Sequence, residues 1–243
     1  MTALLSTEAV KLRTLRTSWV VAALAVAVGA AIGFAAVRIA IGAHEPLGVA
    51  ALAGTPAQAM WFLAIVSAVL ASAGEFQHRT IRTTLLAVPR RPRVLAAKCT
   101  VAAAYGGLLV VIGTAAAVGG GMVAATASGT SFAQTGPSWG HLAGTVAVGA
   151  VFAVLATGLG MLTRSTAIAI GAVLLWRFVG EGILPALLHR DGVTRWTPNG
   201  TAGALIGIGE HPLAPWAAAL MLASYAVAIL TAASVVFLRR DPA

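Results

Sequence analysis

Long apolar runs separated by short polar stretches are the dominant pattern along the chain. A helix needs about 20 mainly apolar residues to cross a hydrocarbon core of roughly 30 Å. The sequence therefore predicts an all-α, polytopic membrane protein in which residues 1–243 form a single transmembrane domain. The six stretches that meet the requirement are residues 19–37, 55–74, 99–125, 141–162, 166–188 and 213–238.

Composition agrees with this pattern and excludes an ordinary soluble domain. Hydrophobic residues make up 59% of the chain and charged residues 9%, whereas a soluble domain carries about a quarter charged residues to cover its surface. The single cysteine, Cys99, excludes an intramolecular disulfide and a cysteine-based zinc cluster. None of the five histidines stands at a metal-binding spacing, so we expect no metal site.

The net charge of +9 is explained by the orientation of the chain in the membrane. If the N-terminus is cytoplasmic, twelve of the sixteen basic residues fall on the cytoplasmic side. This bias follows the positive-inside rule and predicts a multi-pass protein of the cell membrane with both termini in the cytoplasm. The charge therefore gives no reason to expect nucleic acid as a partner. The twelve are Lys11, Arg13, Arg16, Arg79, Arg82, Arg90, Arg91, Arg93, Lys98, Arg164, Arg239 and Arg240.

The segment between the second and third predicted spans, residues 75–98, contains two prolines that predict where helices end and begin. Pro89 should end a helix just before it, because the residue preceding a proline is pushed out of the α region. Pro92 can open the next helix in its first turn. A plain connector needs only two to eight residues, so we interpret this long basic segment as a docking element for a cytoplasmic partner. Its predicted apolar stripe consists of Ile81, Leu85 and Val88.

At this segment the sequence resembles a known family. The run Glu75-x-x-His78-Arg79-Thr80-x-Arg82-x-x-Leu85, followed by Pro89-Arg90-Arg91 and Lys98, is similar to the stretch after the second span in type-2 ABC exporter permeases. The resemblance implies that residues 75–98 hold a cytoplasmic coupling helix that contacts an ATPase subunit. The residues that take this role by resemblance are Glu75, Arg79, Thr80, Arg82, Leu85, Pro89 and Arg91.

The opening of the chain also resembles that family. The run Glu8-x-x-Lys11-Leu12-x-x-x-Arg16 is similar to the N-terminal interfacial helix, which implies such a helix within residues 1–18. On a helical projection, however, Glu8 and Arg16 intrude on the apolar face. Arg16 can extend to the lipid head groups, and Glu8 can pair either with Lys11 or with a partner protein.

Active transport needs an energy source that this sequence does not supply. A P-loop requires a lysine directly after a glycine-rich loop, and neither Lys11 nor Lys98 follows one. We therefore expect no cofactor on this chain, with ATP and Mg bound by a separate ATPase subunit. The resemblance also implies a second permease copy or paralogue. The resemblance further implies outward movement of the substrate, and the few polar side chains in the spans are compatible with a lipophilic one.

Two charged residues lie well inside the fifth predicted span. Arg177 and Glu181 are four residues apart, so they share a helix face and can neutralise each other. An arginine at the centre of a bilayer costs about 2.5–3.5 kcal/mol, which favours pairing. The pair is either a structural ion pair or a gate on the transport pathway. Residues 189–212, which follow, are expected to form an external, partly re-entrant segment.

Two other functions compete with transport. The chain can instead be a non-transporting membrane anchor, sensor or immunity protein that docks a cytoplasmic partner through residues 75–98. It can also be a membrane-embedded enzyme, since residues 136–140 read as G-x-S-x-G around Ser138, with His141 next. A nucleophile elbow needs a strand before the serine, and no sheet is predicted, so we interpret this match as chance.

Overall fold

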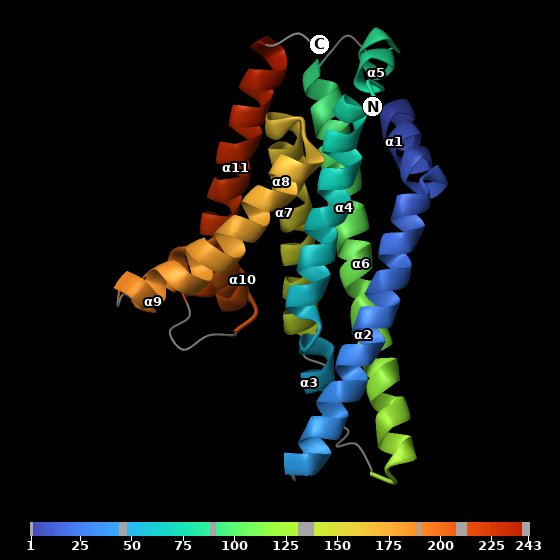
Figure 1. Cartoon of the computed structure of the whole chain (residues 1–243), viewed down its shortest axis with the longest axis vertical. Coiled ribbons are helices and arrows are strands. Elements are labelled where there is room, and N and C mark those ends of the chain that lie inside the picture. Colours follow the sequence, from blue (N-terminus) through green and yellow to red (C-terminus); the bar gives the residue numbers. More distant parts are fainter. Residues whose placement is uncertain are drawn as a thin grey trace.

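A computed structural model describes residues 2–43, 48–87, 91–130, 139–188, 191–207 and 213–239 (Figure 1). Within these ranges the regular structure is entirely helical, and no strand is formed. The predicted all-α class is therefore confirmed. Five positions named above lie outside the described residues, namely Val88, Pro89, Arg90, Ser138 and Arg240.

Six helical segments are long and apolar enough to cross a membrane, as the sequence predicts. The fifth is a composite of three consecutive helical elements, and a short helix, α3 (Val49–Gly54), precedes the second. In chain order the spans are built on α2 (Arg16–Ala43), α4 (Ala57–Gln77), α6 (Arg91–Ala127), α7 (Trp139–Thr163), α8–η1–α9 (Thr166–Leu175, Trp176–Ile183 and Leu184–Leu188) and α11 (Pro215–Arg239).

The helices form an elongated bundle with two different ends. Figure 1 shows the beginning of α1 (Thr2–Thr14), the short helix α5 (Ile81–Ala87) and the end of α11 together at one end, which we call the terminal end. At the opposite end, α2 and α6 extend beyond the neighbouring ends of α4 and α7. Pro92 lies in the first turn of α6, as predicted.

Glycines bring α2 and α6 into close contact along most of their length. A Cβ atom at Gly29 would overlap the carbonyl oxygen of Gly113, and one at Gly33 would overlap that of Ala117. Small residues allow this approach in a membrane, where helices associate by packing and not by expulsion of water. Gly29 and Gly33 therefore allow α2 to pack closely against α6 of the same chain.

The middle of the bundle is an apolar core between α4, α6 and α7. The ring of Trp61 meets that of Phe152 edge to face, with centroids 5.7 Å apart, a favoured geometry for aromatic pairs. The Trp61 indole Nε1 donates a hydrogen bond to the Thr145 carbonyl oxygen at 3.0 Å, which satisfies the one polar group of this buried side chain.

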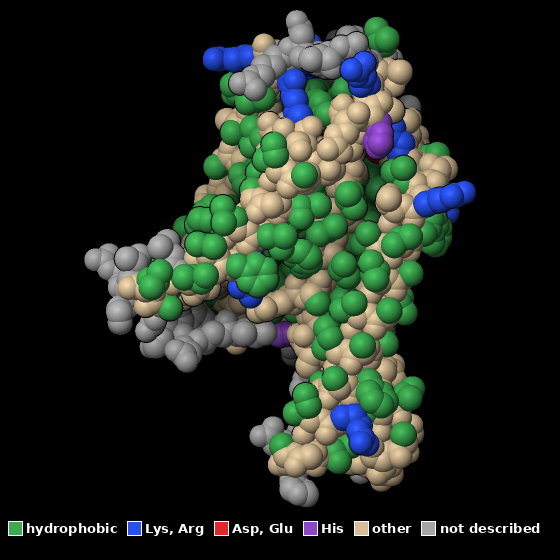
Figure 2. All heavy atoms as spheres, in the orientation of Figure 1, with side chains coloured by type: hydrophobic (Ala, Val, Ile, Leu, Met, Phe, Trp, Pro, Cys, Tyr) green, Lys and Arg blue, Asp and Glu red, His purple; other side chains and the backbone are tan. Residues whose placement is uncertain are grey.

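The fifth span packs loosely on this core and contains a π-helix, η1. Gly180 and Gly182 are weak helix formers, and Pro185 lacks the N–H that an α-helix would use at that position. Ala169 is the one buried residue of α8, and no residue of η1 is buried. Figure 2 shows apolar side chains covering this flank of the molecule.

The residues after the fifth span form two further helical elements, η2 (Asp191–Trp196) and α10 (Pro198–Leu205). Thr201 and Ala202 of α10 are fully buried, and α10 packs against α11 and α7. The Tyr225 hydroxyl of α11 donates a hydrogen bond to the Trp196 carbonyl oxygen. The described part of this segment is thus attached to the bundle.

Candidate functional site

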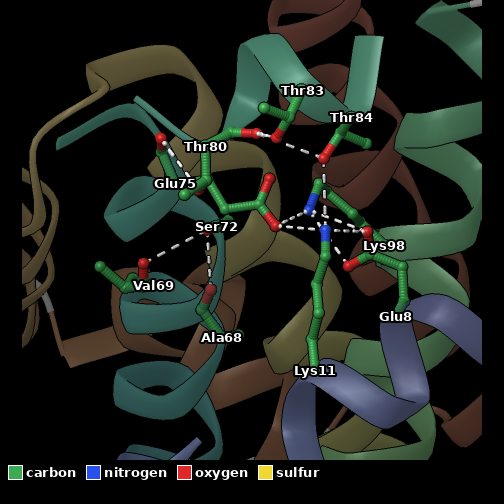
Figure 3. A network of polar contacts seen from close by, with 10 residues as sticks. All are labelled: Glu8, Lys11, Ala68, Val69, Ser72, Glu75, Thr80, Thr83, Thr84 and Lys98. Carbon is green, nitrogen blue, oxygen red and sulfur yellow. Dashed lines mark hydrogen bonds and ion pairs between the residues drawn. The ribbon is translucent and has the colours of Figure 1, made fainter. Parts of the chain in front are cut away.

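Four charged side chains form a network at the terminal end of the bundle (Figure 3). Lys98 Nζ lies 2.6 Å from Glu75 Oε1 and 3.1 Å from Glu8 Oε2. Lys11 Nζ lies 3.0 Å from the same Glu75 oxygen and 2.9 Å from Glu8 Oε1. Each ammonium group therefore contacts both carboxylates, and the four charges balance.

The network is largely removed from solvent. The side chain of Lys98 is 5% exposed and those of Glu8 and Glu75 are 11% exposed, whereas that of Lys11 is 34% exposed. Burial alone would raise the pKa of Glu8, but attraction by Lys98 and the hydrogen bond from Lys11 outweigh it and lower that pKa. Burial would likewise lower the pKa of Lys11, but Glu8 and Glu75 raise it. Both groups therefore stay ionised at neutral pH.

The network joins α1 to three helices that follow one another much later in the sequence, α4, α5 and α6. Glu8 and Lys11 come from α1, Glu75 from the last turn of α4, and Lys98 from α6. Lys11 Nζ also donates to the Thr84 hydroxyl of α5 at 3.3 Å. The intrusion of Glu8 on the apolar face of α1 is thereby explained, because this face turns toward Lys98.

A second cluster, built from aromatic rings and arginines, lies at the same end. The rings of Phe76 and Phe237 meet edge to face, with centroids 6.4 Å apart. The guanidinium of Arg164 lies 5.2 Å from the Phe76 centroid, and that of Arg91 lies 5.9 Å from the Phe237 centroid. Arg91 also donates to the Phe237 carbonyl oxygen at 2.8 Å, which suits a cation near the C-terminus of a helix. Arg91 thus attaches the beginning of α6 to the end of α11.

Helix α5 is anchored to the bundle on one side and open on the other. Ile81 is 2% exposed and packs with Leu95, Met161 and Phe237, whereas Leu86 is 85% exposed. The sequence-based interpretation assigned Ile81 to a groove on a partner. It belongs instead to a buried apolar cluster of its own chain, together with residues of α6, α7 and α11.

The turn between α4 and α5 holds two of the predicted docking residues. Arg79 is exposed and adopts a positive φ of 57°, a conformation that is unfavourable for side chains other than glycine, asparagine or aspartate. The Thr80 hydroxyl donates to the Glu75 carbonyl oxygen at 3.4 Å. Arg82 and Leu85 lie on α5. The turn therefore directs the Arg79 side chain away from the bundle.

A small cavity borders the charge network. Its volume is about 30 Å³, and its lining includes Glu8, Lys98 and the hydroxyl-bearing residues Ser67, Ser72 and Thr157. This is room for about one water molecule. The cavity is too small to hold a lipophilic substrate.

The two charged residues of the fifth span do not pair with each other among the described contacts. Glu181 Oε1 accepts hydrogen bonds from the Trp176 indole nitrogen at 3.2 Å and from the Asn199 backbone nitrogen at 3.1 Å. Arg177 Nη2 donates to Gln58 Oε1 of α4 at 3.4 Å. The expected neutralisation within one helix face is replaced by contacts to two other helices.

The sequence analysis did not identify Lys98 as a site residue, although a signal was present. Lys11 and Lys98 are the only lysines of the chain. A lysine carries a compact charge on a flexible stem, which suits a position between two carboxylates. The sequence analysis named Lys11 as a possible partner of Glu8, and this pair is formed, but it did not connect Lys98 with either carboxylate.

Comparison with known proteins supports the resemblance noted at residues 75–98. The family model of the ABC-2 family transporter protein matches residues 4–180, which include the charge network and α5. A search of the curated proteins found no match. Because the family model covers well over half of the chain, the protein belongs to the ABC-2 family of transporter proteins and is a permease subunit of an ABC transporter.

Proposed function

We propose that this permease works in the cell membrane as part of an ATP-driven exporter, with the terminal end in the cytoplasm. The distribution of basic residues supports this orientation, because the ten described members of the predicted cytoplasmic set belong to segments toward that end. In Figure 2, basic side chains also gather toward the end that carries α1 and α5. Members of this family generally work with a cytoplasmic ABC ATPase, and the chain has no P-loop of its own.

The observation that carries the proposal is the exposure of Leu86 on an anchored helix. Ile81 holds α5 against the bundle while Leu86 is 85% exposed at its surface. An exposed leucine on a segment that also exposes the basic side chain of Arg79 is a suitable contact for a cytoplasmic partner. We assign this contact to the separate ATPase, which would bind ATP and Mg.

The charge network provides a path by which movement of α5 would reach the membrane helices. Lys11 contacts Thr84 of α5 and Glu75 of α4, and Lys98 contacts Glu75 and Glu8. A push on α5 would therefore act on α1, α4 and α6 together, since closely packed elements move as rigid bodies. Six spans form half of a pathway in this proposal, so a second permease copy completes it and a lipophilic substrate is moved outward.

The proposal is tested by changing the exposed face of α5. We expect Leu86→Asp and Arg79→Asn to reduce co-purification of the ATPase and to reduce the stimulation of ATP hydrolysis about tenfold or more, since one buried contact is worth roughly 1.5–3 kcal/mol. Asparagine is chosen at position 79 because it tolerates a positive φ. The matched control is Val193→Asp, which places a charge at a half-exposed valine in η2.

Two results would contradict the coupling role. Normal ATPase binding by Leu86→Asp would show that α5 is not the docking element. Binding without any stimulation of ATP hydrolysis by the unmodified permease would instead favour a passive membrane anchor.

A further inference from the structure

Arg177 is a cation inside the fifth membrane span. It lies about 12 residues, or roughly 18 Å along the helix, from the start of this span at Ser165. The span runs obliquely to the long axis of the bundle (Figure 1), so this length is not the depth of Arg177 in a bilayer. Its contact residue Gln58 lies in the first turn of α4, toward the end opposite α5.

Glu181, the carboxylate nearest to Arg177 in the sequence, makes hydrogen bonds that join two elements. Glu181 Oε1 accepts the backbone N–H of Asn199 in the first turn of α10 and the indole N–H of Trp176. A negative charge at a helix N-terminus is stabilised by the helix dipole and by the unpaired N–H groups there. Glu181 thus holds α10 to η1 and leaves Arg177 without an ionic partner among the described residues.

The contacts of Arg177 are few for a guanidinium, which carries several N–H donors in a planar fork. Its one described hydrogen bond, to Gln58, is long at 3.4 Å and goes to a neutral group. The side chain is exposed, and so are the neighbouring rings of Trp176, 51% exposed, and Phe178, 65% exposed. An exposed cation within a membrane span is unfavourable without an anionic or polar partner, so the site favours an occupant that brings an anion.

We propose that Arg177, together with Gln58, binds the anionic head group of an amphiphilic substrate, a phosphate or carboxylate attached to an apolar body. The planar guanidinium can bind either anion through two parallel hydrogen bonds. The exposed rings of Trp176 and Phe178 provide the adjacent apolar surface. This inference depends on the proposed function only in calling the ligand a substrate of export.

Binding can be measured on the isolated permease, without an ATPase, by quenching of Trp176 fluorescence with brominated lipids in detergent micelles. The difference in quenching between the unmodified protein and a Trp176→Phe variant gives the part of the fluorescence signal that comes from Trp176. We expect brominated phosphatidylglycerol to quench Trp176 at about a tenfold lower mole fraction than brominated phosphatidylcholine, because charge-assisted hydrogen bonds are worth roughly 1.5–3 kcal/mol. Arg177→Gln should abolish this preference, and Arg177→Lys should keep most of it.

The matched control is Arg38→Gln, which removes another exposed arginine, on α2, whose described contact is the Ser128 hydroxyl. This variant should keep the full preference for brominated phosphatidylglycerol.

An equal response to the two lipids in the unmodified protein, or an unchanged preference in Arg177→Gln, would overturn the proposal. Displacement by free glycerol phosphate at similar concentration would also overturn it, since a soluble anion would then suffice. Loss of a permease dimer in Arg177→Gln with the preference intact would assign Arg177 to a subunit contact. Failure of ATPase docking would leave all of these results unaffected.

Discussion

At the scale of single residues, Lys98 is the centre of the buried charge network. Its side chain is 5% exposed and its ammonium contacts both Glu8 and Glu75. Replacing it with methionine keeps the length of the side chain and leaves two carboxylates with a single, partly exposed partner. We expect Lys98→Met to lower the free energy of unfolding by about 3–5 kcal/mol, measured by circular dichroism during SDS titration in mixed micelles.

Two comparisons separate the loss of charge from the loss of packing. Lys11 is more exposed, so Lys11→Met should cost only about 1 kcal/mol. Adding Glu8→Gln and Glu75→Gln to Lys98→Met should restore most of the stability, because no unpaired buried carboxylate remains. Equal costs for Lys98→Met and Lys11→Met would mean that burial of Lys98 does not set the strength of the network.

At the scale of elements, the seam between α2 and α6 depends on residues without side chains. A Cβ at Gly33 would overlap the Ala117 carbonyl oxygen, whereas nothing lies within 4 Å of the corresponding position at Gly42 of the same helix. We expect Gly33→Leu to separate the two helices and to cost about 1–3 kcal/mol or more, seen as a lower apparent unfolding temperature. Gly42→Leu, the matched control, should leave that temperature unchanged. An equal effect of both variants would contradict the claim that close packing at Gly33 holds α2 against α6.

The elements were largely predictable from the sequence because membrane spans depend on length and apolarity. The helix start at Pro92 follows from the geometry of proline, and α6 begins at Arg91 accordingly. The predicted helix stop before Pro89 falls outside the described residues. The site was less predictable. Glu8, Glu75 and Lys98 belong to three helices that only tertiary packing brings together, and a helical projection treats each helix alone.

The fifth span shows where local rules fail. The spacing of Arg177 and Glu181 predicts an ion pair on one helix face. The chain instead forms a π-helix between residues 176 and 183, and Glu181 contacts the start of α10. A segment 18 residues further along the chain thus competes for the carboxylate, and the spacing of charges contains no information about it.

At the scale of the whole molecule, the bundle is packed unevenly. The α4, α6 and α7 helices share a continuous apolar core, whereas the fifth span buries little of its surface against the rest of the chain. In a bilayer this flank contacts either lipid or another protein. This asymmetry is consistent with a permease that completes its pathway with a second copy.

The orientation of the whole molecule is a premise of the proposed coupling to an ATPase, and it can be tested directly. Thr83 on α5 and Thr130 after α6 are exposed and lie at opposite ends of the bundle. In a Cys99→Ala background, which removes the one native thiol, each is replaced by cysteine and treated in intact cells with a membrane-impermeant maleimide. We expect Thr130→Cys to react at once and Thr83→Cys only after permeabilisation, because the positive-inside bias places α5 in the cytoplasm. The reverse order of labelling would place α5 outside the cell, where no ATPase subunit could reach it.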